Sequence, residues 1–201
     1  MSRGLFGIVL AAGQSRRMGY PKPLLVIGGS SFAERVVAAM RGAVEEIVVV
    51  VGAHKDLVGP AFARLDGVRV VDNPHHQRGQ LSSLKAGLQA LPGDARAAMV
   101  HLADQPLVSP QTFVAVAAAY RAGKTPIVIA RYAGKRGHPV VFDRSLFAEL
   151  HNAGEELGAR AVVSARPELV AYVDVDDPAV VIDLDTPEDL ARQGLRVTRP
   201  G

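Results

Sequence analysis

The chain has 201 residues, of which 48% are hydrophobic and 21% charged, and its formal net charge is +3. This length suits one sizeable α/β domain, and the composition is that of a globular protein, not a disordered one. No run approaches 18 consecutive apolar residues, so we predict no membrane span and no membrane partner. The absence of cysteine excludes thiol nucleophiles and thiolate zinc sites, and it is consistent with a cytoplasmic location.

The charge pattern narrows the class of partner. The 20 acidic residues are interspersed among the basic ones, and no contiguous basic tract stands out. A mild positive balance suits an anionic small molecule, whereas a nucleic-acid binder usually carries a basic stripe. We therefore predict no nucleic-acid partner.

Short apolar runs alternate with amphipathic, alanine-rich stretches along the chain. The runs predict strands over residues 5–10, 47–51, 68–71, 98–102 and 127–130. The stretches predict helices over residues 31–41, 81–91 and 111–120. Strands that are apolar on both faces belong inside a parallel sheet that is covered by helices. The pattern thus predicts a three-layer α/β sandwich with a Rossmann-like, mostly parallel sheet, and the N-terminal apolar run is expected to be its first strand, not a targeting segment.

Cap residues in the sequence predict where three helices begin. Ser31 with Glu34 three residues later predicts a capping box. Ser109 before Pro110, and Thr186 before Pro187, each predict a cap followed by proline at the first helical position.

The C-terminal part has a less regular pattern. We predict a strand over residues 138–142, short helices over 143–150 and 155–164, and strands over 170–175 and 180–184. No internal repeat, linker or low-complexity tract interrupts the chain, so residues 1–201 are expected to form a single domain. Residues 131–185 are expected to supply the acceptor side of its site.

The most informative segment is IVLAAGQSRRMGYPK, residues 8–22. Small residues after the strand allow a backbone to approach a ligand closely, and basic side chains neutralise a polyanion. The segment matches neither G-x-x-x-x-G-K-[ST] nor G-x-G-x-x-G. We interpret it as a triphosphate-binding loop, the alternative being a strand-to-helix turn with solvated arginines. The nucleotide-binding residues predicted here are Leu10, Ala11, Ala12, Gly13, Arg17 and Lys22.

Three aspartates are candidate ligands for Mg²⁺, which takes few protein oxygens and completes its shell with water and phosphate. Asp104 follows an apolar strand, and Asp183 and Asp185 lie on the same face of the last predicted strand. One of that pair is expected to bind metal while the other supports it. The alternatives are a turn aspartate before Pro106 and a helix-cap neighbour.

Two further groups complete the candidate site. Gly79, Gln80, Ser82 and Ser83 open a helix, where free amides and hydroxyls hold a base or ribose, or simply cap the helix. A later basic cluster that includes Arg131 and His138 is a candidate for gripping the acceptor, the alternative being a solvated loop. Ligands of open α/β sheets bind outside the carboxyl ends of the strands, and the candidate residues follow strand ends.

Five motifs together resemble the nucleotidyltransferases that attach a nucleotide to molybdopterin. They are LAAGQSRRMGYPK, GQLSSLKAGL, LADQPLVSP, GHPVVF and DLDTPEDL, which span Ile8 to about Leu190. The second alanine of LAAG, Ala12, resembles the version of this motif in the cytidylyltransferase branch of the family. This resemblance implies CTP as the donor and molybdopterin as the acceptor. The segment YPKP, residues 20–23, resembles the corresponding segment of sugar nucleotidyltransferases, so a sugar-1-phosphate acceptor remains an alternative. A non-catalytic nucleotide-binding module is a further alternative.

The resemblance also implies roles. It implies attack of the acceptor's phosphate oxygen on the α-phosphorus of the triphosphate, with Mg²⁺ as cofactor and pyrophosphate as leaving group. By resemblance, Arg17 and Lys22 bind the phosphates, Asp104 binds magnesium, and either Asp185 or Asp183 supplies the second carboxylate. Contacts to the nucleoside fall on Asp72 or Asn73 and on residues 79–83.

Overall fold

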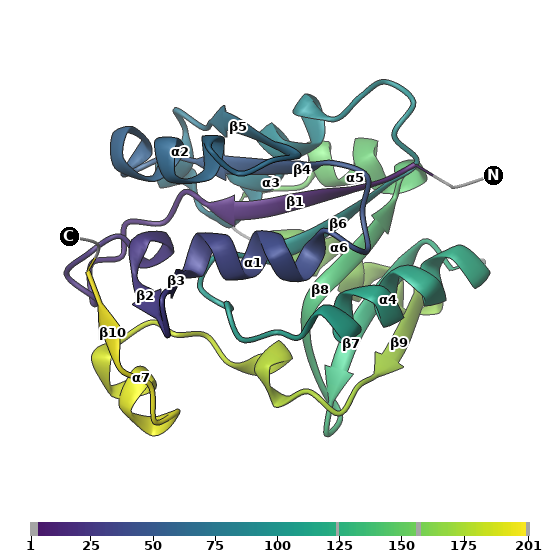
Figure 1. Cartoon of the computed structure of the whole chain (residues 1–201). Coiled ribbons are helices and arrows are strands. Elements are labelled where there is room, and N and C mark those ends of the chain that lie inside the picture. The colour runs from purple at the N-terminus through teal and green to yellow at the C-terminus, as the bar shows by residue number, and fades with distance from the viewer. Residues whose placement is uncertain (1–3, 124, 156–157, 200–201) are drawn as a thin grey trace.

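One seven-stranded sheet dominates the computed structural model, which describes residues 4–123, 125–155 and 158–199 (Figure 1). In spatial order its strands are β5 (Val68–Asp72), β4 (Ile47–Val51), β1 (Leu5–Ala11), β6 (Ala97–Leu102), β8 (Lys135–Asp143), β7 (Ile127–Tyr132) and β9 (Val170–Asp174). Every neighbouring pair is parallel except those made by β8, which runs antiparallel to β6 and β7. The predicted mostly parallel sheet is confirmed.

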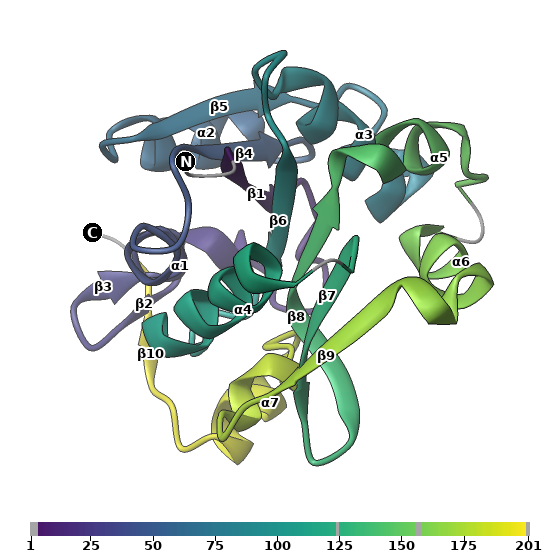
Figure 2. The same ribbon diagram turned by 90° about the vertical axis from the view of Figure 1, so that its right-hand side faces the viewer.

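Helices cover both faces of this sheet (Figure 2). One face carries α1 (Phe32–Met40), α2 (Lys55–Ala63) and α4 (Pro110–Ala122), and the other carries α3 (Gln80–Ala90), α5 (Phe147–Asn152) and α6 (Gly158–Ala165). Alternate residues of the buried strands face opposite layers, so Val9 packs with the first group and Ile8 with the second. The three-layer sandwich is confirmed.

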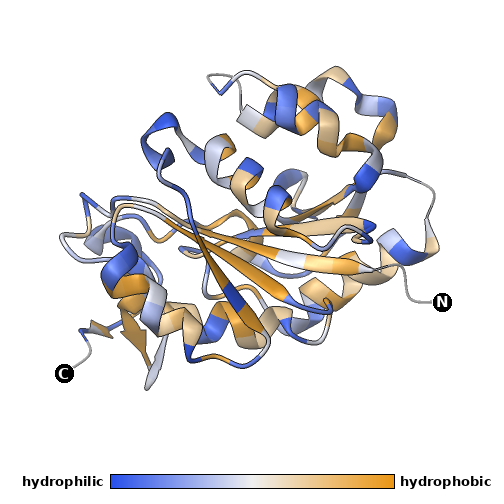
Figure 3. Ribbon diagram, turned by 90° about the horizontal axis from the view of Figure 1, so that it is seen from above, coloured by the Kyte–Doolittle hydropathy of each residue, from blue (hydrophilic) through white to orange (hydrophobic). Residues whose placement is uncertain are grey.

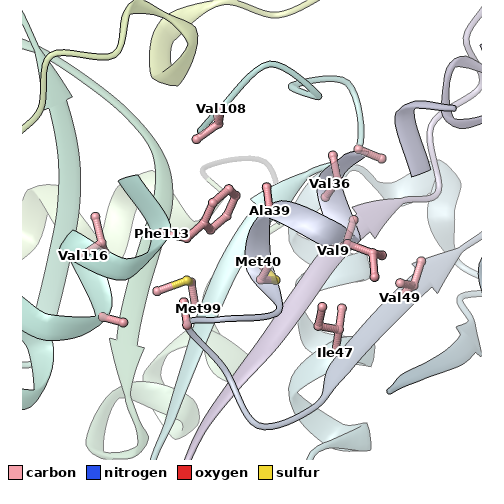
Figure 4. Packing of buried hydrophobic residues seen from close by; sticks show 14 of the residues in the cluster. Val9, Val36, Ala39, Met40, Ile47, Val49, Met99, Val108, Phe113 and Val116 are labelled. Atoms are coloured by element: carbon pink, nitrogen blue, oxygen red, sulfur yellow. The ribbon is translucent and has the colours of Figure 1, made fainter. Parts of the chain in front are cut away.

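The side-chain packing explains why the strands are apolar along their whole length. Figure 3 shows the strands mostly in the hydrophobic colour, while polar residues gather on loops and on outer helix surfaces. In Figure 4, Phe113 of α4 points towards α1, near Ala39 and Met40. Phe113 is fully buried in this cluster. The layer between α1, α4 and the sheet is therefore closely packed.

A satellite cluster anchors the C-terminal end beside the segment that follows β1. The strands β2 (Val26–Ile27), β3 (Ser30–Ser31) and β10 (Val197–Thr198) form a small antiparallel sheet near α7 (Pro187–Arg192). Leu184 and Leu190 are buried there, and Met18 and Tyr20 pack against them. The C-terminal segment therefore supports the loop after β1.

The predicted helix starts are confirmed. Ser31 forms a capping box with Glu34, and the hydroxyl of Ser109 accepts a hydrogen bond from the amide of Thr112. Thr186 forms a second capping box, with Asp189. The helix α2 was not predicted; it contains Gly59 and Pro60, which both have poor helix propensity.

The strand predicted over residues 180–184 is wrong. A 3₁₀ helix, η5 (Pro178–Val181), occupies its first half. Pro178 has a restricted φ at the start of this turn, and the Asp177 carboxylate accepts a hydrogen bond from the amide of Ala179 at 3.1 Å. Residues 182–184 have no regular structure, so strand alternation does not determine where Asp183 and Asp185 point.

Within the described residues, no helix is both long and apolar enough to cross a lipid bilayer.

Replacement of Phe113 tests the packing of the α4 layer. We expect Phe113→Ala to lower the free energy of unfolding by about 3–5 kcal/mol, because it removes a fully buried ring and leaves a cavity. Urea unfolding followed by circular dichroism measures the change. The matched control is Val114→Ala at a side chain that is 48% exposed, where the change should stay within about 0.5 kcal/mol. Equal effects of the two substitutions would contradict this account of the core.

Candidate active site

A cavity of about 450 Å³ lies at the carboxyl edge of the sheet, where β1 and β6 end. We call it the loop cavity, because the loop after β1 (residues 12–21, the β1 loop) supplies much of its wall. Most of the residues predicted to hold the nucleotide line it: Leu10, Ala11, Ala12, Gly13, Arg17, Lys22, Gly79, Gln80 and Ser83. The strand ends thus bring together side chains that are far apart in sequence, as expected for an open α/β sheet.

The β1 loop is held by a tight turn. Ser15 has φ of 49°, in the left-handed region, and its carbonyl accepts hydrogen bonds from the amides of Met18 and Gly19. The Ser15 hydroxyl accepts a hydrogen bond from the amide of Lys22 at 3.1 Å. This bond joins the two ends of the loop and directs Lys22 towards the sheet edge.

Gly52 makes room for close contact between neighbouring loops. A Cβ atom at this position would lie 2.6 Å from the Cβ of His76 and 2.9 Å from the Cβ of Ala12. Any larger residue would therefore push the β1 loop away from the turn that holds His76. The glycine explains how both segments can line one cavity.

Lys22 lies between two carboxylates. Its Nζ is 2.5 Å from Oδ2 of Asp104 and 2.6 Å from Oδ1 of Asp185. Arg17 also forms an ion pair with Asp185, on the more exposed side. The Lys22 side chain is only 13% exposed, whereas that of Arg17 is 68% exposed. The centre of the site is therefore a shielded cluster of one ammonium group and two carboxylates.

The charges of this cluster stabilise one another. Burial alone would lower the pKa of Lys22, but the charges and hydrogen bonds of Asp104 and Asp185 raise it above its ordinary value. Burial alone would raise the pKa of Asp185, yet Lys22 and Arg17 hold it below its ordinary value. Lys22 and Asp185 are therefore both ionised at neutral pH.

The residues present fit a divalent cation. Among the described residues no group of three or more histidine or acidic side chains could hold a metal ion. Asp104 and Asp185 nevertheless place one oxygen each on a single cation, the Lys22 ammonium. Mg²⁺ is commonly bound through one or two carboxylates together with substrate phosphates. Two carboxylates beside the loop cavity match that donor set.

Asp183 points elsewhere. Its Oδ1 accepts a hydrogen bond from Nε2 of Gln105 at 2.7 Å. Burial raises the pKa of Asp183 despite this bond, and the charges of Asp104 and Asp185 add to the rise. Asp183 therefore lies beside the two bridged carboxylates without sharing their cation.

Three residues predicted to contact the nucleoside are not among the described residues that line the loop cavity. Asp72 pairs with Lys55 at 2.7 Å on the surface. Asn73 is buried and donates from Nδ2 to the hydroxyls of Ser82 and Ser83, at 2.9 Å and 3.0 Å. Asn73 and Ser82 thus shape the turn before α3, and Ser83 reaches the cavity.

His76 and Gln77 also line the loop cavity, although neither is among the site residues predicted from the sequence. They belong to a 3₁₀ helix, η2 (His76–Arg78), that follows β5 and precedes α3. The signal that could have found them is Gly52, because the glycine marks a close approach of backbone segments.

A larger cavity of about 1080 Å³ adjoins the first and shares Leu10, Gln80, Leu102, Asp104 and Asp185 with it. Apolar side chains make up much of its wall: Leu81, Leu84, Val100, Ile129, Val140, Phe142 and Val163. Its polar groups include Gln105, Lys135, Arg136, His138, Arg160 and Asp183.

The two predicted acceptor residues differ in position. His138 lines the larger cavity. Burial lowers its pKa to about 4, so it presents a neutral imidazole, not a positive charge. Arg131 is not among the described residues that line either cavity; it pairs with Asp174 at 2.7 Å and stacks on Tyr172. Arg160 on α6, which was not predicted from the sequence, contributes a positive charge to the wall of the larger cavity.

A mostly parallel sheet with a basic loop and two carboxylates at its carboxyl edge defines an α/β nucleotidyltransferase. Residues 7–171 match the family model described as a MobA-like NTP transferase domain. The chain belongs to this family of nucleotidyltransferases.

Two curated relatives differ in how much of the chain they match. Nicotine blue oxidoreductase of Paenarthrobacter nicotinovorans is 34% identical over 196 residues, which are 92% of this chain and 94% of the relative. A probable molybdenum cofactor guanylyltransferase of Bacillus cereus is 34% identical over 108 residues, 53% of this chain and 52% of the relative. The chain thus spans about half the length of the guanylyltransferase.

The solved structure of Rv0371c from Mycobacterium tuberculosis superimposes with a TM-score of 0.81 and 31% identity over 94% of this chain and 97% of that one. A complex of Rv0371c with manganese gives a TM-score of 0.77 and 30% identity over 96% and 98% of the two chains. These superpositions support the fold, and the second shows that one neighbour of this fold has been solved with manganese.

Gly13 tests the shape of the loop cavity. A Cβ at Gly13 would meet no protein atom within 4 Å, and Gly13 lines the cavity. We expect Gly13→Ala to leave the free energy of unfolding within about 0.5 kcal/mol, and to weaken nucleoside triphosphate binding about tenfold by displacing the ligand. Calorimetry measures both. Gly42→Ala is the matched control, since that Cβ also has open space but lies away from the cavity. Unchanged affinity in Gly13→Ala would contradict the assignment.

His138 makes stability depend on pH. Its pKa falls from 6.5 when exposed to about 4 in the fold, so the unfolded chain binds more protons between these values. The contribution of His138 to the free energy of unfolding is therefore fully present above pH 6.5 and is lost as the pH drops towards 4. Removing this contribution with His138→Gln should reduce the slope by about 1.4 kcal/mol per pH unit. Urea unfolding at several pH values tests this, with exposed His151→Gln as control. Identical slopes in wild type and His138→Gln would refute it.

Proposed function

We propose that this protein is a divalent-metal-dependent nucleotidyltransferase that transfers CMP from CTP to the phosphate of molybdopterin and releases pyrophosphate. The observation that carries the proposal is the contact of Lys22 with both Asp104 and Asp185, two aspartates that line both of the adjoining cavities. The loop cavity would hold the triphosphate, and the larger cavity would hold the acceptor.

The chemistry required of the chain is positioning and charge neutralisation. An oxygen of the acceptor phosphate attacks the α-phosphorus of CTP, and the bond to the bridging oxygen of pyrophosphate breaks. The attacking oxygen is already anionic near neutral pH, so no general base is needed. Lys22 would steady the α-phosphate, and Arg17 would hold the departing phosphates. A divalent cation on Asp104 and Asp185, with Mg²⁺ as our choice, would supply further charge neutralisation.

The choice of donor and acceptor rests on separate observations. Ala12, with the motif LAAG, supports CTP. The guanylyltransferase relatives support a molybdopterin acceptor. The larger cavity adds support, because its apolar walls suit a flat ring system better than a sugar, whose hydroxyl groups would each need a polar partner. Residues 131–185 contribute most of the wall of the larger cavity in this proposal. We also propose that the protein acts in the cytoplasm, which the absence of cysteine supports.

A second candidate function follows from the relative that matches 92% of this chain, nicotine blue oxidoreductase. Under this alternative, the two adjoining cavities would hold nicotine blue and its redox partner. A third candidate function is nucleotidyl transfer to a sugar-1-phosphate acceptor. The three are separated by three assays on one preparation: pyrophosphate release with CTP and molybdopterin, pyrophosphate release with a sugar-1-phosphate, and bleaching of nicotine blue with a reduced nicotinamide nucleotide.

Substitution of the aspartates tests the proposed roles in the first assay. We expect Asp104→Asn and Asp185→Asn each to lower kcat/KM for CTP by about 10²–10³, because each removes a charge that acts on the transferring phosphoryl group. Asp183→Asn should have an effect several times smaller, since Asp183 contacts Gln105 and not Lys22.

The control is Asp72→Asn, which breaks a surface ion pair outside the cavities. Pyrophosphate release that depends on CTP and molybdopterin supports the proposal. Release only with a sugar phosphate, or bleaching of the dye without any release, would overturn it.

A further inference from the structure

The two carboxylates assigned to the metal already share a cation that belongs to the chain. The ammonium of Lys22 contacts Asp104 Oδ2 at 2.5 Å and Asp185 Oδ1 at 2.6 Å. A bound Mg²⁺ would lie about 2.0–2.1 Å from its oxygen ligands. An ion that uses both of these oxygens would therefore occupy nearly the same place as the ammonium, and like charges repel strongly at such separations.

The backbones of Asp104, Asp185 and Lys22 are all held by hydrogen bonds, so movement within the cluster must come from a side chain. The carbonyl oxygen of Asp104 accepts a hydrogen bond from the amide of Leu184 at 3.1 Å, which ties the two acidic segments together. The amide of Asp185 donates to Asp189 at the start of α7, at 3.0 Å. Lys22, in contrast, carries its charge on a flexible four-carbon stem, and it lines the loop cavity. Lys22 is therefore the group that can move.

The geometry points to a second role for Lys22: its ammonium competes with the divalent cation for Asp104 and Asp185, so that the metal binds tightly only when a triphosphate draws Lys22 into the loop cavity. The inference rests on the proposed function, because it takes these aspartates as the metal ligands. It goes further by making metal and triphosphate binding mutually dependent. Arg17 cannot substitute for Lys22, since its ion pair is exposed and contacts one carboxylate only.

The test is a titration with Mn²⁺ alone, without nucleotide, in which the free ion is measured by paramagnetic resonance. We expect Lys22→Gln to bind Mn²⁺ about tenfold or more tightly than the wild type, because the competing ammonium is gone. Lys22→Arg keeps a charge that can pair with both carboxylates and should bind Mn²⁺ nearly as weakly as the wild type. Lys55→Gln removes a lysine from another ion pair, away from both cavities, and should leave the Mn²⁺ affinity unchanged.

The outcomes separate this inference from the proposed function. If Lys22→Gln binds Mn²⁺ no more tightly than the wild type, while the wild type still releases pyrophosphate from CTP, the competition is refuted and the function stands. If the wild type releases no pyrophosphate with any acceptor, the proposed function fails, whatever the titration shows.

Removal of Lys22 leaves two neighbouring carboxylates without their shared partner, and this can weaken the fold. Should Lys22→Gln be less stable than the wild type, thermal unfolding with increasing Mn²⁺ provides the readout, together with Lys22→Met as a second variant. Competition predicts that Mn²⁺ raises the Tm of both variants by more than that of the wild type. Equal shifts in all three proteins would overturn it.

Discussion

The rest of the site depends on one constraint: two carboxylates held together at the sheet edge need a cation between them. Lys22 meets this need by contacting Asp104 and Asp185, and so it joins three segments that are far apart in sequence. Such a shielded ion pair is weak evidence for stability, because each charge has lost much of its hydration. Its position beside two cavities, in contrast, is what charge-based catalysis on phosphates requires.

The fold supplies this arrangement through neighbours in the sheet. The strands β1 and β6 are adjacent and parallel, so the segments that follow them, which carry Lys22 and Asp104, begin at the same edge of the sheet. The third partner needs the C-terminal cluster, in which buried Leu184 places Asp185 against the β1 loop. The seven-stranded sheet alone would therefore give only half of the centre. The small sheet and α7 provide the other half.

The sequence could predict the parts of the site that depend on local order, and it failed where side-chain direction depends on tertiary packing. The strand ends, the three helix caps and the β1 loop follow from apolar runs and from cap residues such as Ser31. The mostly apolar residues 180–184 predict a strand, but the tendency of Pro178 to start a turn dominates there. Asn73 follows a strand like Asp104 does, yet it turns inward to Ser82. No local pattern distinguishes these two outcomes.

A shared frame does not by itself determine the chemistry. A relative named for oxidoreductase activity matches almost the whole chain, so the strands, caps and loop lengths are compatible with more than one reaction. What favours nucleotidyl transfer is the charge arrangement: a basic loop for a polyanion and two carboxylates that can share one cation. A redox reaction has no need of two carboxylates that can share a metal ion, and a redox site would still bear the desolvation of these charges. The pairing of Lys22 with both aspartates is therefore the feature of this chain that most favours nucleotidyl transfer over a redox reaction.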